Sequence, residues 1–317
     1  MPGMTTHRGF ATVMDMMSRV HPTPERVVVR EFAGHASHID HLDAPMRVVH
    51  LTDQHLGRVT SMETQLEAIA AANAQNPDVV VLTGDFVCHG QAFLDDLTEV
   101  VRGLSAPVFA VLGNHDYWSG AAPVVRALTR AGVEVLRNQH TTIEVGHQRL
   151  QVVGIDDAYT GHADVERALQ GLRPDLPSIG LSHIAEEADR LWSAGIPLVL
   201  SGHTHAGQIT VARLHELALG RLAGHRYIHG LYGARRGEGA VYVGAGIGAA
   251  IMPLRIGERS RPEVTVFDLG AEPGSLHEHH SEQEALPGRP PTEETRRKRR
   301  EAVEKKRQRR LKRGLPE

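Results

Sequence analysis

The stretch Asp78-Val-Val-Val-Leu-Thr-Gly-Asp85 decides the fold, because a short apolar run is followed at once by a glycine and a carboxylate. An apolar run of this length is typical of a strand buried on both faces of a sheet. The same pattern returns at Pro107 to Leu112, which is followed by Gly113-Asn114-His115-Asp116. Both runs therefore predict strands that deliver polar side chains just past their carboxyl ends.

Three further runs end in the same way. They are Met46 to Thr52 before Asp53 and His55, Ser178 to Leu181 before His183, and Pro197 to Leu200 before His203 and His205. Helical patterns lie between the runs, at Ser61 to Gln75, Ala92 to Gly103, Ala121 to Ala131, Asp164 to Gly171 and Ala185 to Ala194. In α/β proteins, functional groups collect beyond the carboxyl ends of strands. The sequence thus predicts an α/β fold with its polar loops gathered at one edge.

These polar motifs contain groups that bind divalent metals through oxygen or imidazole nitrogen. Any one motif, such as Asp-x-His or Gly-Asp, occurs in many proteins by chance. A lone His183 before Ile184 would more often be a buried structural histidine than a ligand. The ordered set of motifs is what indicates a site for two metal ions that acts on phosphoesters.

The ordered motifs resemble those of the calcineurin-like metallophosphoesterases, whose pattern is D-x-H, G-D-x-x-D, G-N-H-D/E, a lone His and G-H-x-H. The resemblance covers Val27 to Leu269 and implies two facing mixed β-sheets flanked by helices. It is most marked for a bacterial envelope-associated branch, on the segments Leu112 to Trp118, Gly154 to Asp157 and Gly202 to Gln208. That branch includes metal-dependent phosphodiesterases and enzymes that cleave the pyrophosphate of UDP-2,3-diacylglucosamine.

The resemblance implies two divalent ions of Mn, Fe or Zn, with a hydroxide between them as the nucleophile. The implied ligands of one metal are Asp53, His55 and His205. Those of the other are Asn114, His183 and His203. The carboxylate of Asp85 is implied to bridge the two metals.

His115 is the implied proton donor to the leaving oxygen. In many relatives its ring is oriented by the second aspartate of G-D-x-x-D, a carboxylate beyond the metal ligands. That position is Cys88 here, the only cysteine of the chain. Support for His115 is then expected from Asp116 or from His89.

Two further residues are candidates for substrate binding. Tyr117 is predicted to line the substrate wall, with a position in the core as the equal alternative. Arg255 is predicted to contact a substrate phosphate, with a surface salt bridge as the alternative.

Composition fits one sizeable globular enzyme. The chain has 317 residues, of which 41% are apolar and 23% charged, which suffices for a full α/β core. One cysteine excludes a disulfide framework and suits a reducing compartment. No apolar run reaches the roughly 18 residues needed to span a bilayer, and Met1 to Pro24 lack a signal pattern. We therefore expect a cytoplasmic protein, either free or peripheral to the inner face of the membrane.

The expected division is an N-terminal extension at 1–26, a catalytic domain at 27–270, a disordered linker at 271–291 and a basic tail at 292–317. Residues 296–317 hold 12 Lys and Arg against 3 Glu, a net charge of +9, whereas the other 295 residues carry −12. Pairs at i,i+4 such as Glu293 and Arg297 favour a helix in the tail. The tail is predicted either to do little or to tether the protein to an anionic membrane or nucleic acid.

The function indicated is a dinuclear-metal-dependent hydrolase of phosphodiester or pyrophosphate bonds, with manganese among the expected metals. The implied substrate is a small phosphodiester, a nucleotide-sugar or a lipid-linked phosphate, which would place the enzyme in lipid metabolism. One alternative is a nuclease or cyclic-nucleotide phosphodiesterase. Another is a catalytically weak metal-binding module, for which Cys88 is the motive. The sequence leaves the oligomeric state open.

Overall fold

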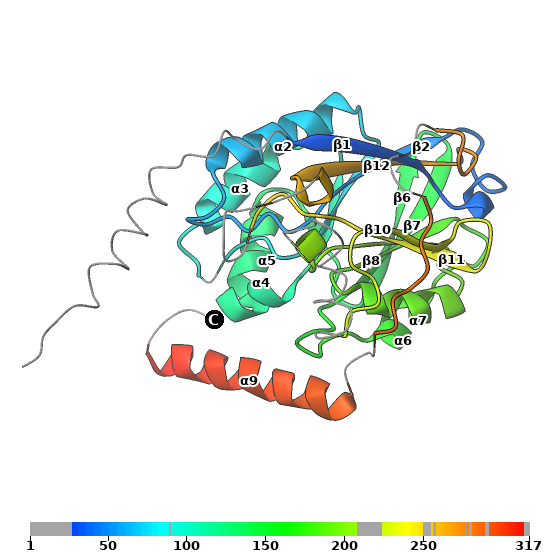
Figure 1. Ribbon diagram of the computed structural model, residues 1–317. Coiled ribbons are helices and arrows are strands. Elements are labelled where there is room, and N and C mark those ends of the chain that lie inside the picture. Colours follow the sequence, from blue (N-terminus) through cyan, green and yellow to red (C-terminus); the bar gives the residue numbers. More distant parts are fainter. Residues whose placement is uncertain are drawn as a thin grey trace, which may run out of the picture.

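Two six-stranded sheets form the centre of the computed structural model (Figure 1). The structure describes residues 27–317 except 89, 208–223, 250–254, 256–257, 277, 279–280, 289–291 and 314–317, so the expected extension at 1–26 lies outside it. The first sheet has the order β1 (Val28–Ala33), β12 (Glu263–Leu269), β2 (Met46–Leu51), β3 (Val79–Thr83), β4 (Val108–Val111) and β5 (Glu134–Val135). The second has the order β10 (Gly230–Ala234), β11 (Gly239–Val243), β9 (Leu198–Ser201), β8 (Ser178–Ser182), β7 (Gln148–Ile155) and β6 (Gln139–Val145).

Both sheets are mixed. In the first, β2, β3, β4 and β5 run parallel to one another, β1 is parallel to β12, and β12 is antiparallel to β2. In the second, β11, β9, β8 and β7 are parallel, while β10 and β6 are antiparallel to their neighbours. The predicted fold class, two mixed sheets flanked by helices, is confirmed.

The helices occupy the segments in which the sequence predicts them. They are α2 (Met62–Ala74), α3 (Leu94–Arg102), α5 (Ala121–Arg130), α6 (Val165–Ala168) and α7 (Ala188–Ser193), the last preceded by a 3₁₀ turn at Ala185–Glu187. Ser61 starts α2 as an N-cap, because its side chain accepts a hydrogen bond from the backbone N–H of Thr64. A further short helix, α4 (Asn114–Ser119), follows β4 directly and was not predicted.

The strands bury both of their faces. Along β3, Val79 and Val81 belong to the core between the sheets, whereas Val80 and Leu82 pack under α2, α3 and α5. Successive side chains of a strand point to opposite faces, so one strand contributes to two cores. Val153 of the second sheet packs likewise under α6 and α7. Since β3 also packs against β8, the polar loops that follow these strands meet at one edge of the sandwich.

The C-terminal segment packs on the body. Glu278 and Glu282, in the expected linker, both form ion pairs with the buried Arg235. The linker at 271–291 itself stays a prediction. A buried guanidinium needs carboxylate partners, and these two glutamates provide them. The tail forms helix α9 (Glu293–Lys312), which lies below α4 and α6 in Figure 1. None of the described helices is both long and apolar enough to cross a membrane.

Candidate dinuclear metal site

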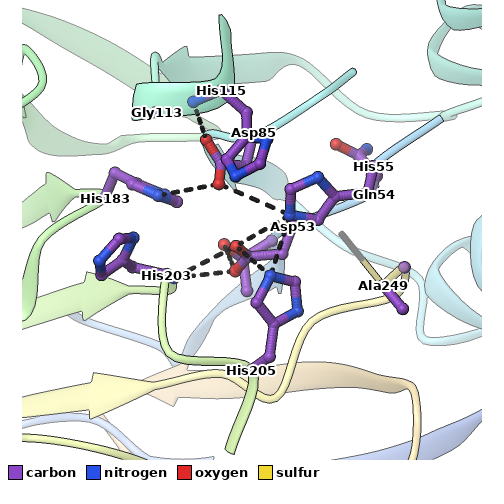
Figure 2. Close-up of polar contacts among 12 residues, drawn as sticks. Asp53, Gln54, His55, Asp85, Gly113, His115, His183, His203, His205 and Ala249 are labelled. Carbon is purple, nitrogen blue, oxygen red and sulfur yellow. Dashed lines mark hydrogen bonds and ion pairs between the residues drawn. The ribbon is translucent and has the colours of Figure 1, made fainter. Parts of the chain in front are cut away.

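Loops after β2, β3, β8 and β9 bring the predicted metal ligands to one place (Figure 2). One group of side chains offers ligand atoms that all lie within 4.8 Å of one another, namely Asp53, His55, Asp85 and His205. A second such group consists of Asp85, His183 and His203. The seventh predicted ligand, Asn114, begins α4 and is buried.

Asp85 belongs to both groups. Its Oδ2 lies 3.5 Å from Nε2 of His55 and 3.3 Å from Nε2 of His183. Its Oδ1 accepts a 2.8 Å hydrogen bond from the backbone N–H of His115. A carboxylate that faces two sets of ligands can hold two cations close together.

The ligand loops have an unusual backbone. Positive φ occurs at eight non-glycine residues of the described chain, and five of these are candidate ligands: Asp53, His55, Asp85, His203 and His205. Residues with a Cβ rarely adopt this left-handed backbone, so surrounding contacts must stabilise it. The backbone N–H of Asp53 donates to the carbonyl of Gly84, and that of His55 to the carbonyl of Asp85. Strain of this kind clusters at functional sites.

Two motif glycines are required by close packing. A Cβ at Gly113 would lie 2.3 Å from Oδ1 of Asp85, and a Cβ at Gly202 would lie 2.2 Å from Oδ2 of Asp53. Both distances are far below van der Waals contact. The glycines of G-N-H-D and G-H-T-H therefore let the backbone approach the two carboxylates.

Burial sets the protonation of three imidazoles. It lowers the pKa of His55 to about 3, with the neighbouring His205 acting in the same direction. Burial also lowers the pKa of His205 to about 3 and places the pKa of His203 well below its usual range. The rings are neutral at pH 7, which is the form in which an imidazole nitrogen binds a metal.

Asp85 and His183 influence each other. Burial alone would raise the pKa of Asp85, but the charge and hydrogen bond of His183, together with the other neighbouring histidines, outweigh burial and hold that pKa well below its usual range. Burial would lower the pKa of His183, whereas the Asp85 carboxylate raises it to about 10. Because metal ligands must be deprotonated, a cation bound to this pair would displace the proton of His183.

Neighbouring atoms orient the ligands toward a metal. Nδ1 of His183 lies 2.7 Å from the carbonyl oxygen of Thr83, so Nδ1 carries a hydrogen and Nε2 faces Asp85. Oδ1 of Asn114 is buried and has no hydrogen-bond partner within the described residues. Such an acceptor is costly unless something satisfies it, and a cation would do so. The residues present therefore fit a pair of divalent metals.

Residues 46–207 match the family described as Calcineurin-like phosphoesterase. The chain belongs to this family. It is 30% identical over 252 residues to the uncharacterized metallophosphoesterase YkuE of Bacillus subtilis, which covers 78% of this chain and 86% of that protein. It is 32% identical over 234 residues to the phosphodiesterase YaeI of Escherichia coli, with 71% and 83% of the two chains covered. The protein is thus a metal-dependent phosphoesterase, as the resemblance implied.

In this calcineurin-like phosphoesterase, His115 lies between two other rings. Its ring centroid is 4.7 Å from that of His55, edge-on, and 4.6 Å from that of Trp118. The sulfur of Cys88 and one ring nitrogen each of His55 and His115 lie within 4.8 Å of one another. Burial raises the pKa of Cys88 to about 11, so its thiol is neutral at pH 7. Cys88 therefore stands beside His115 without the negative charge that an aspartate would bring.

Asp116, a predicted catalytic residue and candidate support for His115, has backbone partners. Its buried carboxylate accepts hydrogen bonds of 2.9 Å from the backbone N–H groups of Asp85, Phe86 and Gly113. These bonds tie the loop after β3 to the start of α4, so Asp116 positions two ligand loops. A catalytic role for Asp116 stays a prediction, and the alternative support, His89, lies outside the described residues.

Tyr117 takes part in a polar cluster at the rim. Its hydroxyl donates to Asp156 at 2.7 Å and accepts from Arg137 at 2.9 Å, and its ring stacks on His162 with centroids 4.0 Å apart. Tyr117 also lines a cavity of about 320 Å³. The cavity leaves room for a substrate beside Tyr117, and contact of Tyr117 with substrate stays a prediction.

Arg255 is buried beside the site. Its guanidinium donates to the backbone carbonyls of Ala245 and Ser260, at 3.0 and 2.6 Å, and to that of Gly248. These bonds fix the backbone after β11. The sequence had suggested a substrate contact or a surface salt bridge for Arg255. Substrate binding by Arg255 stays a prediction.

One aromatic residue of the site was not predicted from the sequence. The ring of Tyr159 lies 5.4 Å from that of His203 and 5.9 Å from that of Trp118. No motif contains Tyr159, and its nearest signal is the segment Gly154 to Asp157 that carried the resemblance. Tyr159 extends the wall of the site from the metal ligands toward α9.

Proposed function

We propose that the protein hydrolyses phosphodiester or pyrophosphate bonds with two divalent metal ions. Asp85 would bridge the metals, and the remaining ligands are those of two clusters: Asp53, His55 and His205 for one, and Asn114, His183 and His203 for the other. The observation that carries this proposal is the position of the Asp85 carboxylate, which lies in both clusters at once.

When bound, the two cations would supply a hydroxide nucleophile at neutral pH and stabilise charge on the attacking and leaving oxygens. The residues of the chain do the rest. Asp85 fixes the spacing of the ligands, with its carboxylate held by the backbone N–H of His115. The imidazolium N–H of His115 donates a proton to the leaving oxygen, and packing against Trp118 holds the ring in place.

The donor set favours some metals over others. Imidazole nitrogens suit Fe and Zn, and carboxylate and amide oxygens suit Mn, whereas Ca and Mg prefer sites made of oxygen alone. Four of the seven candidate ligands are histidines: His55, His183, His203 and His205. Manganese, iron or zinc are therefore the proposed metals.

The proposed substrate is lipid-linked or a nucleotide-sugar, which rests on the resemblance to the envelope-associated branch alone. Exposed cations of α9 such as Lys298 would hold the protein at an anionic membrane surface, each contributing about 1 kcal/mol. The second candidate is a catalytically weak metal-binding module, which the neutral Cys88 beside His115 favours.

The experiment measures metal content and turnover together. After reconstitution with Mn²⁺, elemental analysis should find two metals per chain, and the protein should hydrolyse bis(4-nitrophenyl) phosphate. Asp85→Asn should lose both properties, whereas Asp95→Asn, the same change at a side chain that is 94% exposed, should keep them. Two metals without turnover would favour the binding module, and no stoichiometric metal would refute the proposal.

A further inference from the structure

Helix α9 presents a cationic face to the body of the protein. Its half-buried side chains are Thr295, Arg296, Arg299 and Val303. Arg299 follows Thr295 and Arg296 by four and three residues and precedes Val303 by four, so the four share one side of the helix. The other described side chains between Glu293 and Leu311 are exposed. Two of the four inward-facing residues carry a positive charge, which is unusual for the packed side of a helix.

Arg299 lies on the aromatic wall of the metal site. Its guanidinium carbon is 3.7 Å from the centre of the Tyr159 ring. The Tyr159 ring in turn lies 5.4 Å from the ring of the candidate ligand His203, and it meets Trp118, which packs on His115. One aromatic ring therefore separates Arg299 from the metal cluster.

The two inward-facing arginines differ in their partners. Arg296 pairs with Glu187 at 3.4 Å, and Glu187 also binds Arg190. In the described part of the chain, no carboxylate pairs with Arg299, which lies over the face of Tyr159. The charge of Arg299 is thus available to a ligand.

A cavity of about 210 Å³ lies against Arg299, and its lining includes Tyr159, Glu186 and His225. Glu186 is engaged by His225 and by the backbone N–H of Arg226, at 3.2 and 3.1 Å. The lining also holds Glu187 and Arg296, which pair with each other. Of these two described arginines of the cavity wall, Arg299 is the one without a carboxylate partner.

We propose that Arg299 binds a second anionic group of the substrate, one that is not itself hydrolysed. The enzyme would then prefer phosphoesters that carry a further phosphate. This inference rests on the proposed function, because the hydrolysed phosphate is taken to lie at the metals. Contact with the face of Tyr159 holds the guanidinium in place, and arginine binds phosphate through paired N–H donors. On this view α9 is part of the substrate site, beyond the membrane tether that its charge suggested.

Two substrates that differ by one phosphate test the proposal: thymidine 5′-(4-nitrophenyl phosphate) and its 3′-phosphorylated derivative. Both release nitrophenol from the same phosphodiester. Arg299→Gln should lower kcat/KM for the 3′-phosphorylated substrate about tenfold or more, mainly through KM, as expected for one lost charge-assisted contact. The same variant should change kcat/KM for the other substrate less than twofold. Arg297→Gln, on the exposed side of the same helix, should change neither.

Binding to the Mn²⁺-loaded protein gives a readout that does not need turnover. Thymidine 3′,5′-bisphosphate should bind more tightly than thymidine 5′-phosphate, and Arg299→Gln should remove the difference while Arg299→Lys keeps part of it. Equal losses for both ligands would mean that Arg299 only docks the helix, and unchanged affinities would mean that it binds no anion; either result overturns the proposal. Absence of turnover in the unaltered protein would count against the proposed hydrolysis, whereas the binding comparison still decides the role of Arg299.

Discussion

The Nε2 atoms of His55 and His205 lie 2.9 Å apart, although the two residues are 150 positions apart in the chain and follow strands of different sheets. The approach requires that the two sheets pack correctly on each other. Two neutral imidazoles that converge in this way direct their nitrogens to one point, where a cation can accept both.

Removal of one of these rings should empty one metal position. His205→Ala is expected to lower the metal content of Mn²⁺-reconstituted protein from two per chain to one and to remove most turnover. The melting temperature of the metal-free protein should change little, since no core packing is lost. His41→Ala, at an exposed histidine, is the control, and retention of both metals by His205→Ala would show that this ligand is misassigned.

The role of His115 depends on the leaving group. A nitrophenolate leaves without a proton, whereas an alkoxide needs one in the transition state. His115→Ala should therefore slow the hydrolysis of alkyl diesters by about 10²–10⁴-fold and that of nitrophenyl esters much less. Steady-state rates on the two substrate types make the comparison, and equal losses on both would favour charge stabilisation over proton donation.

Cys88 offers a gain-of-function test. An aspartate at this position would place a negative charge beside His115 and favour its protonated form. Cys88→Asp should raise turnover of alkyl diesters, and Cys88→Ser, which adds no charge, should not. An absence of gain from Cys88→Asp would mean that another residue already supports His115.

Asp116 should matter for stability as well as for the site. Asp116→Asn keeps the size of the side chain but turns an amide NH₂ toward backbone N–H groups that now donate to a carboxylate. We expect the free energy of unfolding to fall by about 1–3 kcal/mol, the cost of leaving a buried N–H group without an acceptor. Urea denaturation measures it, with Asp95→Asn as the exposed control; a change below about 0.5 kcal/mol, as at ordinary surface sites, would contradict the positioning role.

Acid should destabilise the fold through His38, far from the metal ligands in sequence. Its Nε2 binds the carbonyl of Ser178, its Nδ1 accepts from the backbone N–H of His35, and burial lowers its pKa to about 4. The unfolded chain, with a pKa near 6.5, binds the proton more readily. The free energy of unfolding should therefore fall as the pH is lowered from 6.5 to 4, by up to about 3 kcal/mol for this residue.

Denaturation curves between about pH 4 and pH 6.5 give the slope of the free energy of unfolding against pH. His38→Gln should have a smaller slope than the unaltered protein, and the exposed His41→Gln should keep it. The slope that remains would come from the other buried histidines whose pKa is lowered, such as His50, His55 and His205. An unchanged slope in His38→Gln would mean that His38 is not the group that binds the proton.

The ligand loops could be predicted because their signal is local. Asp53, Asp85 and His183 are each among the first polar residues after an apolar run, and the carboxyl ends of such strands meet in an α/β fold. The order of the motifs then identified the family. Asp53, His55, Asp85 and His205 form one cluster, and Asp85, His183 and His203 form another. The assignment of each ligand to a metal stays a prediction.

The features that escaped prediction depend on contacts between distant residues. Asp116 binds backbone groups some 30 positions away, which no side-chain motif records. Arg235 binds Glu278 from more than 40 positions away. The packed face of α9 could not be predicted, because it contains arginines and few apolar residues. Tyr159, the aromatic partner of Arg299, lies 140 positions earlier in the chain.

The left-handed backbone at the ligands lowers the stability of the fold at the same residues that are needed for activity. Each such residue costs of the order of 1–3 kcal/mol relative to a relaxed conformation, and five of them occur in this site. Glycine adopts this backbone without penalty, so His55→Gly would relieve strain while it deletes a ligand. A laboratory screen that rewards heat resistance alone should therefore collect replacements of the very residues that bind metal, and any thermostable variant must be selected for turnover at the same time.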